Sequence, residues 1–141
     1  MIKEDYVSFE TAKLLKEKGF DEPSRFWYDN NGVISQKYID ATDKPLGKGT
    51  HYHCVTVSFA ITLQMAMKWL REKHKLFIDI TAAMEDYIEN GVVKYKDPYY
   101  TWEVFSLEIG ETLCFGEAQN VKKSYEAACE SAIKYCLENL I

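Results

Sequence analysis

The chain has 141 residues, of which 47% are apolar and 14% aromatic, a composition that suits one domain with its own hydrophobic core and excludes a disordered chain. Its net charge of −5 is uneven, because residues 1–75 carry 12 lysines and arginines against 10 acidic residues, whereas residues 76–141 carry 5 against 12. The acidic second half excludes a protein that wraps nucleic acid with its whole surface, and no apolar run reaches the ~18 residues that span a membrane.

The first half of the chain predicts a helix, a hairpin, a strand and a second helix. The first helix begins at the N-cap Ser8 and ends at Gly19, which suits the left-handed conformation that closes a helix. An Asn31-Gly32 pair between β-rich runs predicts a hairpin turn. The elements that follow are a loop over 35–50, an alternating strand over 51–59 and a helix over 62–74 whose apolar stripe contains Leu63, Ala66, Met67, Trp69 and Leu70.

The second half predicts an antiparallel hairpin and a third helix. Residues 82–98 are ambiguous, because Asn90-Gly91 is typical of a hairpin tip whereas Met84, Tyr87 and Ile88 also fit one helical turn. We favour the hairpin, with strands over 76–88 and 92–109. The third helix begins at the N-cap Ser124 and runs to the end, and its apolar positions are Tyr125, Ala128, Cys129, Ala132, Ile133, Cys136, Leu137 and Leu140.

Together these elements predict one α+β domain over residues 1–141. The approximate order is α-ββ-α-ββ-α, with three helices packed mainly on one face of an antiparallel sheet. Its later half overlaps with the α-β-β-β-α order of double-stranded-RNA-binding domains, an analogy of fold that does not determine function. The segments KLLKEKG at 13–19 and KWLREKH at 68–74 are similar in residue type, which leaves open a duplication of a helix–hairpin unit.

The charged N-terminus and the lack of a membrane-spanning apolar run indicate a cytoplasmic protein. The first ten residues do not read as a signal peptide, and a reducing compartment keeps cysteines as thiols. Cys54, Cys114, Cys129 and Cys136 are therefore expected to be small buried apolar residues rather than a disulfide framework.

A candidate metal site consists of His51 and His53. On a strand these two side chains point to the same side, and with His74, an acidic residue or a cysteine they could bind zinc. The favoured interpretation is a solvated strand end, because no second pair with ligand spacing is present. A small metal-dependent or hydrolytic enzyme at this pair is one alternative function. No nucleophile turn or complete phosphate loop occurs, so no catalytic residue and no cofactor is assigned.

A candidate nucleic-acid site consists of Lys13, Lys16, Lys68, Arg71 and Lys75, near the ends of the first two helices. Exposed aromatic side chains such as Phe26, Tyr28 or Trp102 would stack bases beside them. The simpler interpretation is that lysine and arginine at helix C-termini complement the helix dipole. Nucleic-acid binding is therefore the second hypothesis.

Three sequence blocks resemble one group of small uncharacterised bacterial proteins. The blocks are SFETAKLLKEKGFDEP at 8–23, TLQMAMKWLREKH at 62–74 and SYEAACESAIKYCLENLI at 124–141, and the group occurs in gut anaerobes of the bacteroides type, often beside prophage or mobile-element genes. A proline usually precedes the middle block in that group, where this chain has Ile61. The group has no assigned functional residues, so the resemblance implies a bacterial or phage-borne accessory protein without implying a chemistry.

The leading hypothesis is a non-enzymatic protein-binding or accessory module that recognises a protein partner or its own copy. The chain can build a core and is rich in aromatic residues, yet no cluster of polar residues converges on a chemistry. No membrane partner is expected.

Overall fold

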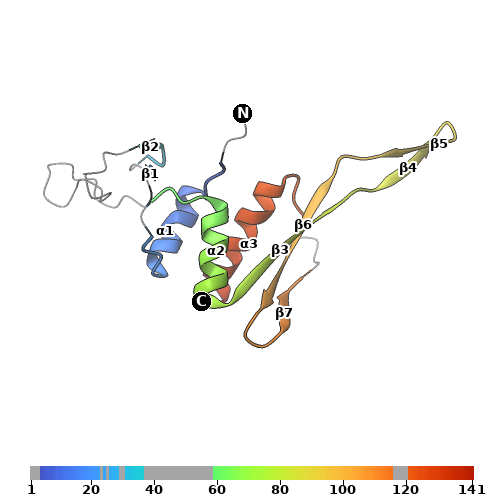
Figure 1. Ribbon diagram of the computed structural model, residues 1–141. Helices are drawn as coiled ribbons and strands as arrows, with labels where there is room; N and C mark the ends of the chain where they lie inside the picture. The colour runs from blue at the N-terminus through green and yellow to red at the C-terminus, as the bar shows by residue number, and fades with distance from the viewer. Residues whose placement is uncertain (1–3, 23, 25, 29–30, 37–58, 116–120) are drawn as a thin grey trace, which may run out of the picture. The chain divides into compact units, whose positions relative to one another are not determined.

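A computed structural model describes residues 4–22, 24, 26–28, 31–36, 59–115 and 121–141 (Figure 1). In this part of the chain the three helices are α1 (Phe9–Glu17), α2 (Leu63–His74) and α3 (Tyr125–Asn139). The strands are β1 (Phe26–Tyr28), β2 (Ile34–Gln36), β3 (Leu76–Ala83), β4 (Asp86–Glu89), β5 (Val92–Tyr95), β6 (Tyr99–Ser106) and β7 (Glu111–Cys114). All their pairings are antiparallel, which confirms the predicted α+β class.

The chain divides into two compact units, Met1–Ala66 and Met67–Ile141. The order of helices and hairpins is as predicted, because a hairpin follows α1 and a longer hairpin follows α2. The prediction missed β7, since the strand expected over 92–109 ends at Ser106. The amide of Gly110, at φ +72°, donates to the Ser106 carbonyl at 2.9 Å, and this turn reverses the chain into β7.

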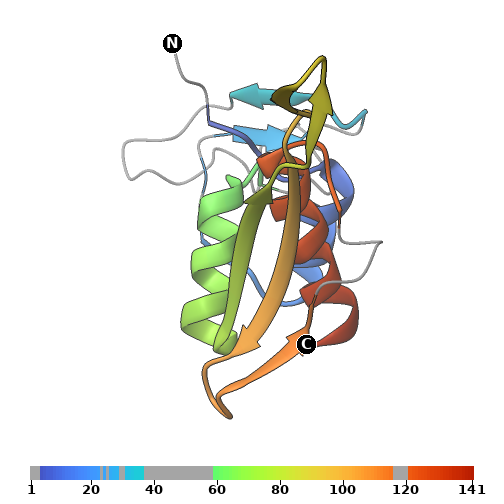
Figure 2. The same ribbon diagram turned by 90° about the vertical axis from the view of Figure 1, so that its right-hand side faces the viewer.

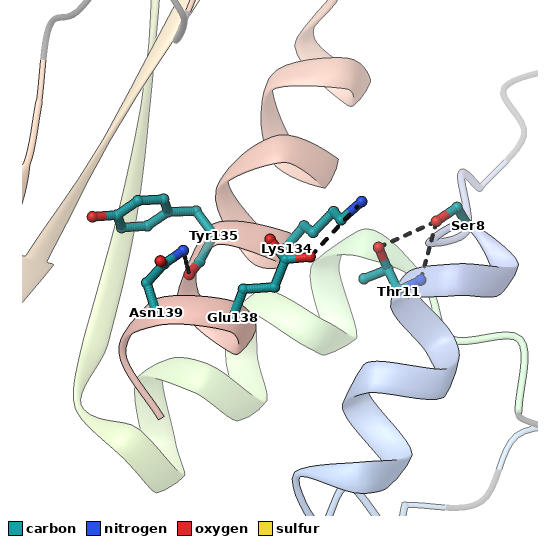
Figure 3. Close-up of polar contacts among 6 residues, drawn as sticks. All are labelled: Ser8, Thr11, Lys134, Tyr135, Glu138 and Asn139. Atoms are coloured by element: carbon teal, nitrogen blue, oxygen red, sulfur yellow. Dashed lines mark hydrogen bonds and ion pairs between the residues drawn. The ribbon is translucent and has the colours of Figure 1, made fainter.

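In the first unit, side-chain and backbone caps determine where α1 begins and ends. The Ser8 hydroxyl accepts a hydrogen bond from the amide of Thr11 at 3.2 Å and donates one to the Thr11 hydroxyl at the same distance (Figure 3). At the other end Gly19 has φ +92°, and the next amide, of Phe20, donates to the Leu15 carbonyl at 2.9 Å. Both predicted boundaries are thereby confirmed.

The predicted hairpin of the first unit is formed by β1 and β2. Phe26 pairs with Gln36 and Tyr28 with Ile34, and Tyr28 is buried with its hydroxyl donating to the Val7 carbonyl. The strand expected over 51–59 lies outside the described residues except for Phe59, which bridges to Trp27. Cys54 and most of the loop expected over 35–50 also lie outside them.

The second helix begins where the sequence predicts. The Thr62 hydroxyl accepts a hydrogen bond from the amide of Met65 at 3.1 Å, which is the bond that an N-cap residue makes. Of the predicted apolar stripe, Met67 is half-buried, and the four residues Leu63, Ala66, Trp69 and Leu70 are buried.

The second unit is a three-stranded sheet in the order β3-β6-β7, with α3 packed on β3 and β6. Figure 2 shows the sheet in front of this helix. Burial alternates along both long strands, and the buried positions are Leu76, Ile78, Trp102, Val104 and Ser106. The Trp102 ring lies 5.2 Å from the ring of Tyr135 on α3, so these positions face the helix.

The third helix carries the most deeply buried stripe of the second unit. Ser124 caps its N-terminus by accepting from the amide of Ala127 at 3.1 Å. Six of the predicted positions have no exposed surface: Ala128, Cys129, Ala132, Ile133, Cys136 and Leu137. Tyr125 is 39% exposed, so the stripe begins one turn later than its spacing predicts. The expected burial of cysteines holds for two of them, while Cys114 is half-buried.

The ambiguous segment 82–98 is a hairpin and not a helical turn. β4 and β5 continue β3 and β6 away from α3 (Figure 1). At the tip, Asn90 has φ +51° and Gly91 φ +74°, the two positive angles of a type I′ turn. Pairing shifts by one residue between Ala83–Tyr99 and Asp86–Tyr95. The additional residue lies beside Pro98, which has no amide hydrogen for the ladder.

Replacing Gly91 by valine is expected to loosen this tip. A β-branched side chain at φ +74° costs roughly 1–2 kcal/mol, whereas asparagine tolerates the same backbone conformation. Amide hydrogen exchange measures the effect, with faster exchange expected in β4 and β5 of Gly91→Val and unchanged exchange in α3. Equal exchange in Gly91→Val and the control Gly91→Asn would contradict the turn assignment.

Candidate protein-binding site

The histidines of the predicted metal site, His51 and His53, lie outside the described residues, so zinc binding there stays a prediction. Within the described part of the chain, no group of three or more His, Cys, Asp or Glu could hold a metal ion. His74, the proposed third ligand, is half-buried with its ring 4.6 Å from that of Trp69. Partial burial lowers the pKa of this imidazole.

The basic residues of the predicted nucleic-acid site are exposed in both units, on α1, on α2 and, for Lys75, directly after the end of α2. In the first unit, Lys13 and Lys16 lie on α1, with the Lys13 ammonium 4.5 Å from the centre of the Phe9 ring. In the second unit, the exposed residues are Lys68, Arg71 and Lys75. Lys68 is 3.8 Å from the carboxylate of Glu72, so part of its charge is neutralised along its own helix.

The aromatic residues proposed to stack bases are mostly unsuited to that role. Tyr28 and Trp102 are only 5% and 4% exposed, because their strand positions face the core. Phe26 is half-buried, with its ring 5.6 Å from the Tyr6 ring. The expectation of exposed stacking rings at Tyr28 and Trp102 was therefore wrong.

A different feature of the second unit suits a binding role, namely the hairpin extension over residues 84–98, which we call the arm. Successive side chains of a strand alternate between faces, and directly paired residues share a face. One face therefore carries the pairs Asp86–Tyr95 and Ile88–Val93, and the other carries Tyr87–Lys94 and Glu89–Val92. We call the former the apolar face of the arm and the latter its charged face.

Ion pairs connect the two strands of the arm on its charged face and at its base. The Lys96 ammonium lies 2.8 Å from the Glu85 carboxylate, and Lys94 pairs with Glu89. The hydrogen bond and positive charge of Lys96 hold the pKa of Glu85 below its usual value. Exposed pairs of this kind contribute little stability, but they leave these four charges matched within the arm.

Among the described residues, no ion pair involves a side chain of the apolar face. Ile88 is 77% exposed, Tyr95 63% and Val93 52%. Asp86, beside Tyr95, has no ion-pair partner among the described residues. Contiguous exposed apolar side chains on a projecting element mark an interaction surface more often than isolated ones do.

A groove with a volume of about 960 Å³ lies at the base of the arm, beside the start of α3. The Tyr100 amide donates to the Lys122 carbonyl at 2.8 Å, and the Lys122 amide donates to the Tyr100 carbonyl at 2.7 Å. The centres of the Tyr100 and Tyr125 rings are 6.3 Å apart in an edge-to-face arrangement. Three lysines and three acidic residues line the groove: Lys96, Lys122, Lys123, Glu85, Asp97 and Glu126. Because these charges balance, the groove does not favour an anionic ligand.

The first unit has a smaller hollow of about 260 Å³, lined in part by Tyr6, Phe26 and Met65. Burial, followed by the charge of Glu4, raises the pKa of the Tyr6 phenol, so this hydroxyl is no candidate base. The arm therefore remains the feature that is best suited to a partner.

The sequence indicates the arm only in part. The Asn90-Gly91 turn and the apolar residues on either side of it predict the hairpin, but they do not indicate whether another element covers it. Its exposure follows from the length of the paired strands beyond α3, which no local pattern reveals.

No protein-family model, curated protein or solved structure matches this chain. Within the described residues, no helix combines the length and the apolarity needed to cross a membrane.

Proposed function

We propose that the protein is a non-enzymatic protein-binding module whose contact element is the arm. The apolar face would pack against a protein partner or a second copy of the chain, and the charged face would remain in water. The resemblance to bacterial and prophage-associated proteins supports an accessory role in bacteria or their phages. The proposal places the protein in the cytoplasm, a reducing compartment in which the thiols of the buried Cys129 and Cys136 persist.

The observation that carries this proposal is the difference between the two faces of the arm. An isolated two-stranded ribbon is marginally stable in water, and this one leaves Ile88, Val93 and Tyr95 more than half exposed. The charged face also exposes Tyr87 and Val92, but between them lies the Lys94–Glu89 pair. A partner would bury the apolar side chains without having to desolvate a matched ion pair.

The double variant Ile88→Ser/Val93→Ser is expected to lose association while keeping its fold. Both side chains are exposed, so the stability of the monomer should change by less than about 1 kcal/mol. The matched control is Tyr87→Ser/Val92→Ser, which removes apolar surface from the charged face. Size-exclusion chromatography with light scattering measures the self-association of the wild type and the two variants. A quantitative pull-down from a lysate of the native host measures how much partner protein each of the three captures.

Association that decreases in Ile88→Ser/Val93→Ser and persists in the control supports the proposal. A wild-type chain that is strictly monomeric and captures nothing would count against it. Equal capture by the wild type and the apolar-face variant would exclude the arm as the contact element.

Nucleic-acid binding is the second candidate, favoured by the order of elements from α2 to α3. Without the arm, this order is α2-β3-β6-β7-α3, the α-β-β-β-α pattern of double-stranded-RNA-binding domains. The exposed Lys68, Arg71 and Lys75 would supply the phosphate contacts, which makes binding salt-dependent. This candidate is dropped if neither single- nor double-stranded oligonucleotides bind at low salt.

A further inference from the structure

The sheet of the second unit has one face that α3 does not cover. On β3 and β6 the residues opposite the buried positions point away from the helix, and in Figure 2 this side of the sheet is turned toward the viewer. No described element of the second unit lies over it. We call this the open face, and its residues are Phe77, Asp79, Thr81, Thr101, Glu103 and Phe105.

The register arranges the open face in rows of like residues. Phe77 lies directly opposite Phe105, Asp79 opposite Glu103, and Thr81 opposite Thr101. Phe77 is 40% exposed, and Asp79 is exposed as well. A pair of phenyl rings, a pair of carboxylates and a pair of hydroxyls thus follow one another across the same two strands.

The carboxylate row is unfavourable for the isolated fold. Like charges directly opposite one another on a sheet destabilise it, and β3, β6 and β7 contain no lysine or arginine. Neither Asp79 nor Glu103 has a basic partner among the described residues. Two unmatched negative charges therefore lie beside two phenyl rings on a solvent-facing surface.

We propose that the open face binds an arginine-bearing segment of a partner protein. Adjacent rows are about 7 Å apart, so one guanidinium can stack on a phenyl ring while its N–H groups reach the carboxylates. Arginine combines this stacking with paired hydrogen bonds to a carboxylate, and a lysine ammonium does not. The site lies on β3 and β6 and is separate from the apolar face of the arm, so it extends the proposed binding function to a second surface.

Fluorescence anisotropy with a fluorescein-labelled nine-residue peptide of alternating arginine and threonine tests this assignment on the full chain. The wild type is expected to bind it more tightly than the same peptide with lysine. Asp79→Asn/Glu103→Gln should weaken binding by about tenfold or more, because charge-assisted hydrogen bonds are lost. The charge-matched control Glu108→Gln/Glu126→Gln changes two exposed acidic residues outside the open face and should bind almost as the wild type does.

A thermal melt separates this role from a structural one. Removing the opposed carboxylates should raise the melting temperature of Asp79→Asn/Glu103→Gln while binding falls, which a damaged fold cannot produce. Equal losses in both double variants would show nonspecific attraction to an acidic protein and overturn the proposal. Lysine peptide binding as tightly as arginine peptide would overturn it as well. Ile88→Ser/Val93→Ser should bind the peptide normally, so failure of the arm and failure of the open face are distinguishable.

Discussion

Leu137→Asp is expected to unfold the second unit of the protein. Leu137 has no exposed surface and lies in the buried stripe of α3, the helix that packs on β3 and β6. An aspartate there would place a carboxylate in an apolar core at a cost of several kcal/mol, comparable with the ~5–15 kcal/mol that stabilises a whole domain. Circular dichroism during thermal or urea unfolding measures the loss, and Ile133→Asp should behave alike.

The control lies one residue away on the same helix. Lys134 and Glu138 are partly exposed and 3.9 Å apart (Figure 3), so Glu138→Gln should cost less than about 0.5 kcal/mol. If Leu137→Asp instead melted like the wild type, the stripe of α3 would be exposed in solution. It would then be a partner-binding surface rather than core, and the architecture of the second unit would be wrong.

Raising the pH above about 9 is expected to destabilise the folded protein through Cys136. Burial, with a smaller contribution from Cys114, raises the pKa of this thiol from 9.0 to about 12. Unfolding exposes the thiol, which then ionises near its ordinary pKa. The stabilisation is therefore complete below pH 9 and is lost as the pH rises toward 12, and each pKa unit corresponds to about 1.4 kcal/mol.

The comparison that isolates this effect is with Cys136→Ala, since tyrosines and lysines also titrate at alkaline pH. The alanine variant leaves a small cavity whose cost does not depend on pH. Relative to this variant, the wild type should lose about 1.4 kcal/mol between pH 7 and pH 10 and roughly 4 kcal/mol by pH 12. Parallel stability profiles for the two proteins, measured by urea unfolding, would show that Cys136 ionises as readily in the folded chain as in the unfolded one.

The local sequence alone determines where most elements begin, end and turn. Ser8, Thr62 and Ser124 cap their helices as predicted, and Asn90-Gly91 forms the predicted hairpin tip. These features depend on a side-chain oxygen within reach of a nearby amide, or on a residue that tolerates positive φ. Such interactions span only a few residues, so the sequence pattern is sufficient to predict them.

Alternation along a strand indicates that its two faces differ, but it does not indicate which face another element covers. Along β6, the buried Trp102 and Val104 alternate with the less buried Glu103 and Phe105. The helix α3, which follows much later in the chain, covers the face that carries Trp102. This ring therefore lies in the core and cannot stack on a base.

The exposure of both proposed binding surfaces also depends on the tertiary structure. The arm is exposed because β3 and β6 continue past the helix that covers them, and the open face pairs Asp79 with Glu103 because the strands align in this register and no other. The register of the strands and the choice of the face that a helix covers depend on contacts between residues far apart in the chain. Each of these contacts is weak, and only their sum selects one arrangement. The sequence by itself therefore determined most of the elements and their order, though not β7, and packing determined which side chains remain available to a partner.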